Sequence, residues 1–136
     1  MRDTVLWTHE TVLAADAVSA ARARAFVQDQ LLAHDLPDVV EDSRLVVSEL
    51  ATNAVLHAQT PFTVTLEGTQ QSVVLTVRDG SSSVPVPVTA DVLDTTGRGL
   101  SIVDLVSRDW GVSVGEDGAK AVWASFAART REPTPG

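Results

Sequence analysis

Residues 60–80 hold two stretches in which apolar and polar side chains alternate, separated by a short loop around Gly68. In the first, TPFTVTLEG, every second residue is apolar; the second is SVVLTVRDG. Alternation with a period of two predicts strands that bury one face. The short separation predicts that the two strands form a β-hairpin, and therefore that at least this part of the sheet is antiparallel.

Two helical patterns precede this hairpin and follow one another directly. Residues 16–33 lack Gly and Pro. Apolar side chains at helical spacing mark the buried side of this first helix: Ala23, Phe26, Val27 and Leu31. Pro37 and the acidic residues just after it favour the start of a second helix, which we expect to reach about His57.

The remaining predicted elements are shorter. In chain order they are an edge strand at 4–9, a long Ser- and Pro-rich loop at 80–96, a helix from Gly99 or Leu100, and strands at 110–115 and 120–128 joined by an EDG turn. Because helices cluster and strands are mostly hairpin-linked, the order predicts an α+β fold, a two-layer sandwich with helices on one face of a largely antiparallel sheet. We expect one domain over 1–128 and a disordered tail over 129–136.

Composition excludes several classes of function. The chain of 136 residues has no cysteine, which excludes disulfides, thiolate zinc sites and thiol catalysis. Its 18 acidic and 10 basic residues give a net charge of −8, which disfavours nucleic acid and anionic membranes as partners. The N-terminus lacks a signal-peptide pattern, and no run approaches the roughly 20 apolar residues of a membrane span. A cytoplasmic protein is expected.

The second helix carries an acid and an amide one turn apart, in ELATNAVLHA. Glu49 and Asn53 would project side by side, about 6 Å apart along one face, among apolar neighbours. Such oxygen atoms suit Mg²⁺, and a carboxylate can also take a proton from a nucleophile. The alternative is that Glu49 is solvated at the helix flank and Asn53 makes a local hydrogen bond.

Asp79 and Gly80 end the second strand of the hairpin. A carboxylate at a strand end, followed by flexible backbone, can accept a hydrogen bond from a ligand amine such as the exocyclic amino group of adenine. The alternative is an ordinary Asp-Gly turn, since both are standard turn residues.

The stretch TGRGLSIV, residues 96–103, places glycines directly before a predicted helix. Free N–H groups at a helix start bind anions, and Arg98 between the glycines could reach phosphate oxygens. The alternative is a flexible loop leading into a helix. Neither a Rossmann fingerprint nor a classical P-loop is present.

Taken in order, these three features resemble the motifs of the Bergerat-fold (histidine-kinase-like) ATPases. ELATNAVLHA resembles the N-box, VRDG the first glycine box, and GRGLSIVDLVSRDWGV the second glycine box; GAKAVWASF resembles the last strand. Among these ATPases the chain is most similar to bacterial anti-sigma-factor serine/threonine kinases, over roughly residues 12–127. The resemblance implies a helical layer on a mixed, mostly antiparallel sheet.

The resemblance also implies a site, cofactors and partners. Glu49 corresponds to the catalytic glutamate that activates the attacking hydroxyl. Asn53 corresponds to the Mg²⁺ ligand, and Asp79 to the carboxylate that binds the adenine amino group. The remaining nucleotide-binding set is Gly80 with the phosphate lid and helix start, Gly97, Arg98, Gly99 and Leu100. The implied cofactors are ATP and Mg²⁺. The implied partners are a sigma factor and an anti-sigma antagonist protein, with homodimerisation common in such proteins.

The chain departs from the family pattern at two places. Ser81 and Ser83 replace glycines of the first glycine box, and serine restricts the backbone more than glycine does. Ala121 matches a position where a threonine often lies beside the adenine. These departures keep open a non-catalytic binding module, with ATP as a structural ligand or absent. A sensor histidine kinase is disfavoured, because 136 residues leave no room for a phospho-accepting histidine on a dimerisation helix.

Overall fold

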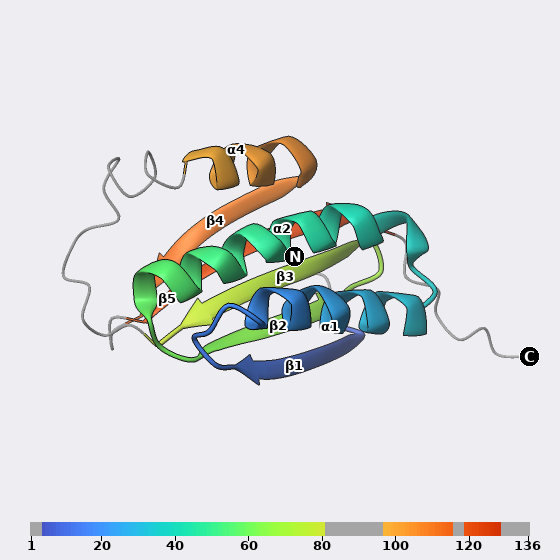
Figure 1. The fold of residues 1–136 in the computed structure, drawn as a ribbon. Coiled ribbons are helices and arrows are strands. Elements are labelled where there is room, and N and C mark those ends of the chain that lie inside the picture. Colours follow the sequence, from blue (N-terminus) through green and yellow to red (C-terminus); the bar gives the residue numbers. More distant parts are fainter. Residues whose placement is uncertain (1–3, 81–96, 116–118, 129–136) are drawn as a thin grey trace, which may run out of the picture.

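The computed structural model describes residues 4–80, 97–115 and 119–128, which form a sheet covered by helices (Figure 1). In chain order the elements are β1 (Trp7–Leu13), α1 (Ser19–Ala33), the 3₁₀ turn η1 (Pro37–Val39), α2 (Val40–Asn53), the π turn η2 (Ala54–Ala58), β2 (Phe62–Gly68), β3 (Ser72–Asp79), α4 (Gly97–Val106), β4 (Asp109–Val114) and β5 (Lys120–Ala127).

The five strands form one sheet in the order β1-β2-β3-β5-β4, and every neighbouring pair is antiparallel. The predicted β2–β3 hairpin and the α+β class are confirmed. The mixed sheet implied by the family resemblance is antiparallel throughout in the described strands. The reason is that β5 returns between β3 and β4, so these two strands, which run in the same direction, never pair.

The helices lie on one face of the sheet, as predicted (Figure 1). The alternation in β2 and β3 sends every second side chain into the core, where water is excluded from apolar surface. The fully buried larger side chains include Val27, Leu31, Val46, Val47, Phe62, Val64, Leu66, Val73, Leu75 and Val103. The predicted stripe on α1 is confirmed, since three of its four members are buried and Phe26 packs against the core from its edge.

Element ends differ from the sequence-based expectation where tertiary pairing decides them. The first strand runs over Trp7–Leu13 rather than 4–9, because β2 offers hydrogen-bond partners along that whole length. The second helix reaches Ala58 only by changing to a π turn after Asn53. The predictions for 81–96, the EDG turn at 116–118 and the tail at 129–136 lie outside the described residues.

Trp7 joins three elements at the edge of the fold. It pairs with Gly68 of β2, where a Cβ atom would lie 2.1 Å from Cε2 of the indole. The ring therefore rests directly on bare backbone. The indole also stacks on His34, just after α1: the ring centroids are 4.0 Å apart and the planes differ by 7°. The His9 ring lies 5.5 Å from the indole, centroid to centroid. The indole thus connects β1 and β2 to the end of α1.

Gly68→Ala tests this packing. We expect the free energy of unfolding to fall by about 1–3 kcal/mol, because the new methyl group must displace the indole from the sheet. Chemical denaturation measures the change. In a Trp7→Leu background the added cost of Gly68→Ala should shrink, since the smaller side chain can move aside. An equal cost in both backgrounds would show that Trp7 is not the obstacle.

Candidate functional site

The acid–amide pair, Glu49 and Asn53, lies on the flank of α2 that faces away from α1. The flank that faces α1 carries Ser48, whose Oγ accepts a hydrogen bond from Nη1 of Arg24 at 2.9 Å. Successive helical residues turn by about 100°, so Glu49 and Asn53 project from the other side of the buried stripe. Both side chains are half-buried. In Figure 1 that side of α2 is the one on which α4 lies.

Asn53 is the last residue of α2 and leads directly into the π turn η2. Short π turns insert an extra residue into a helix and occur frequently at functional sites. The turn closes with Gln59, whose backbone N–H donates to Ala54 O at 3.2 Å and whose φ of 56° lies in the left-handed region. This irregular turn lets the chain leave α2 at Asn53 and enter β2 close to the end of β3.

Asp79 is a buried carboxylate on the helix-facing side of the sheet. It continues the alternation of Val73, Leu75 and Val77 and pairs in register with Phe62, a core residue. Its exposed fraction is 4%. A buried carboxylate is costly unless it is paired or used, so this position is unlike that of an ordinary exposed turn aspartate.

Lys120 of β5 lies opposite Asp79 and was not identified from the sequence. Its Nζ is 4.0 Å from Asp79 Oδ2, and the two residues pair in register. The ammonium group partly compensates the charge of the buried carboxylate. Only the register of β5 brings these residues together, and no sequence signal links them.

Ala121, which the resemblance matches to a family threonine, does not lie on the same face of the sheet as Asp79. Ala121 pairs with Arg78, and both lie on the face of the sheet away from the helices. Side chains alternate between faces along a strand, so Ala121 points away from the side on which Asp79 lies. The residue of β5 that pairs with Asp79 is Lys120.

The glycine-bracketed stretch forms the start of α4 rather than a loop before it. The helix begins at Gly97, so Arg98, Gly99 and Leu100 lie in its first turn. The side chains of 97–101 lie outside the described part of the structure. A helix beginning at this point still directs its first backbone N–H groups outward, and such groups bind anions.

The three sequence features meet at one end of the molecule. In Figure 1 the C-terminal end of α2, the tip of β3 and the first turn of α4 lie at the same end of the sheet. Asp79 is buried there, and Glu49 and Asn53 are on the α4 side of α2. Residues 81–96, which connect β3 to α4, lie outside the described residues.

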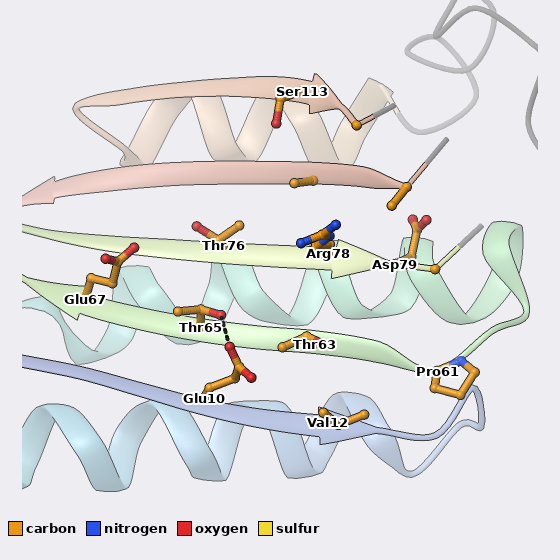
Figure 2. A pocket seen from close by; sticks show the side chains of 14 residues that line it. Glu10, Val12, Pro61, Thr63, Thr65, Glu67, Thr76, Arg78, Asp79 and Ser113 are labelled. Atoms are coloured by element: carbon orange, nitrogen blue, oxygen red, sulfur yellow. Dashed lines mark hydrogen bonds between the residues drawn. The ribbon is translucent and has the colours of Figure 1, made fainter. Parts of the chain in front are cut away.

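A separate groove of about 770 Å³ lies mainly over the face of the sheet that the helices leave open (Figure 2). Polar side chains from neighbouring strands line it, among them Thr63, Thr65 and Arg78, and Thr65 Oγ1 donates to Glu10 Oε2 at 3.4 Å. Asp79 and Gly80 border one end of the groove, whereas the acid–amide pair does not line it. The threonines of β2 were predicted as the polar face of a strand, but not as the wall of a groove.

The described residues contain no cluster of three or more His, Asp or Glu that could hold a metal ion by themselves. An amide oxygen and a nearby carboxylate nevertheless fit Mg²⁺, which keeps several waters and is commonly bound by one or two side chains together with phosphate oxygens. Within the described ranges, no helix is both long and apolar enough to span a bilayer.

Comparison with known proteins agrees with this arrangement. The family model of the histidine kinase-like ATPase domain matches residues 13–126, from the end of β1 to β5. Among curated proteins, no match to the chain is found. The match covers most of the chain and contains all three sequence features together with the sheet that brings them to one end. The chain therefore belongs to the family of histidine kinase-like ATPase domains.

Proposed function

We propose that this chain is an ATP-binding anti-sigma regulatory factor. It acts as a serine/threonine kinase on an antagonist protein and holds a sigma factor in an inactive complex. The observation that carries the nucleotide site is the burial of Asp79 at the same end of the fold as Asn53 and the start of α4. The anti-sigma role is supported by the resemblance of the three motifs.

In this function Asp79 recognises the base. Its carboxylate accepts a hydrogen bond from the exocyclic amino group of adenine, and burial strengthens that bond by excluding competing water. Gly80 leaves room for close approach, because a Cβ atom there would lie 3.9 Å from its nearest neighbours, Pro61 O and Thr60 Oγ1. Lys120 compensates Asp79 while no base is present.

The triphosphate then extends toward α2 and α4. Asn53 supplies an amide oxygen to Mg²⁺, which when bound neutralises charge on the phosphates. The first turn of α4 offers backbone N–H groups to the phosphate oxygens, with Arg98 in that turn. Glu49 takes the proton of the attacking serine or threonine hydroxyl as the new oxygen–phosphorus bond forms, while the bond from the γ-phosphorus to the β,γ-bridging oxygen breaks and ADP leaves. Few residues are needed, because phosphoryl transfer depends mainly on positioning and on charge.

A non-catalytic module that only sequesters a partner is the second candidate. The observation that favours it is the pair of serines, Ser81 and Ser83, where the family motif has glycines. Both positions lie outside the described residues. The retained Glu49 favours the kinase, because a module that only binds has no use for a base at this position.

Asp79→Asn tests the base-binding role. We expect the affinity for ATP to fall about ten- to a hundredfold, because a hydrogen bond to a charged group contributes roughly 1.5–3 kcal/mol. Isothermal titration calorimetry with Mg-ATP measures it, with Asp38→Asn, exposed near the start of α2, as the matched control. Unchanged affinity in a folded Asp79→Asn protein would place the base elsewhere.

Glu49→Gln separates the kinase from the binding module. The substitution keeps the size of the side chain and removes the base, so we expect ATP to bind normally while transfer to the partner slows about a hundred- to ten-thousandfold. Radiolabelled phosphate transfer measures the rate. Glu41→Gln, exposed in the first turn of the same helix, should keep the original rate. If Glu49→Gln also keeps it, Glu49 is not the base.

The partners can be identified by affinity capture from the native cell, followed by incubation of the captured proteins with Mg-ATP. We expect a sigma factor and a small antagonist protein, the latter phosphorylated on serine or threonine. The Glu49→Gln protein should capture the same partners without phosphorylating them. Capture of neither partner would overturn the anti-sigma assignment, while binding of ATP without any transfer would support the module.

A further inference from the structure

His9 and His34 meet at the end of the sheet opposite to Asp79. Their Nε2 atoms are 2.8 Å apart, although the residues are 25 positions apart in the chain. Their ring centroids are 5.1 Å apart. When two Nε2 atoms are 2.8 Å apart, the centroids of their rings can hardly lie farther apart than this. Each ring therefore directs its Nε2 atom straight at the other ring.

A contact of this kind requires one proton between the two nitrogens. One Nε2–H donates and the other Nε2 accepts. The arrangement holds when both imidazoles are neutral, and also when the pair carries one additional proton on an outer nitrogen. When both rings are imidazolium ions, both inner nitrogens are donors and the two positive charges repel. The contact is therefore compatible with one added proton and incompatible with two.

The surroundings of His34 favour one positive charge on the pair. His34 follows the last turn of α1, where backbone carbonyls favour a cation, and it stacks on the face of Trp7. Burial and the charge of His9 lower the pKa of His34. The nearby carboxylates are exposed or on another face: Asp29 and Asp35 are exposed, and Glu10 and Glu67 project from the opposite face of the sheet.

We propose that His9 and His34 form a one-proton latch that fastens the edge strand β1 to the C-terminal end of α1 and opens when both rings are protonated. The latch includes Trp7, because its ring lies between Gly68 and the His34 imidazole. Opening removes the stacking partner of Trp7 and loosens β1, which pairs only with β2 among the described strands.

The direction of the pH effect follows from proton linkage. Because the pKa of His34 is lowered in the fold, the unfolded chain binds more protons in mild acid, and stability rises with pH. The contribution of His34 to the free energy of unfolding is complete above the ordinary histidine pKa of 6.5. It is lost as the pH falls from 6.5 through the lowered pKa of His34. Mild acid therefore weakens the latch.

Unfolding between about pH 8 and about pH 5 tests the latch in the full chain. We expect the unfolding equilibrium constant of the wild-type protein to rise about tenfold more over this range than that of His9→Gln or His34→Gln, because glutamine does not titrate. His57→Gln, which removes the third histidine, should keep the wild-type dependence. An equal dependence in all four proteins would overturn the latch.

A second measurement on the wild-type protein does not depend on the variants folding. The imidazole NMR resonances of His34 should report a pKa below the ordinary histidine value, and protonation of His34 should accompany faster amide exchange in β1, after correction for intrinsic exchange. Titration of His34 at the ordinary value, or unchanged β1 exchange when His34 is protonated, would contradict the proposal.

Discussion

The register of β3 between β2 and β5 is the constraint on which the rest of the site depends. Side chains in this strand alternate strictly, so the pairing that buries Val73, Leu75 and Val77 also buries Asp79 on the helix side. A shift by one residue would expose the carboxylate and bury Arg78 in its place. The hydrophobic core thus fixes a charged group, and the free energy gained by the apolar residues offsets the cost of burying it.

The helix α2 is held in a similar way by its apolar stripe, with different chemistry on each flank. On one flank Ser48 accepts a hydrogen bond from Arg24 of α1, which fixes the rotation of the helix. The other flank carries Glu49 and Asn53 toward α4. The π turn after Asn53 ends the regular helix where the pair is needed and redirects the chain into β2. Packing on one side therefore orients polar groups on the other.

The two ends of the sheet have different roles in this picture. Asp79 and Lys120 lie at one end, where β3 ends and β5 begins. At the other end Trp7, His9 and His34 fasten the edge strand. Gly68 makes that contact possible, because any side chain there would occupy the place of the indole. The ATPase family match over residues 13–126 includes α1 and β2, whereas Trp7 and His9 lie before it.

The sequence by itself determined the fold class, the β2–β3 hairpin and the faces of α1 and α2, because these depend on local periodicity and burial. It also singled out Glu49, Asn53 and Asp79, since their motifs are short and contiguous. Only the tertiary structure decided that α4 begins at Gly97, that Lys120 rather than Ala121 lies beside Asp79, and that His9 meets His34. These features depend on strand register and helix docking, which join residues far apart in the chain and leave no local pattern.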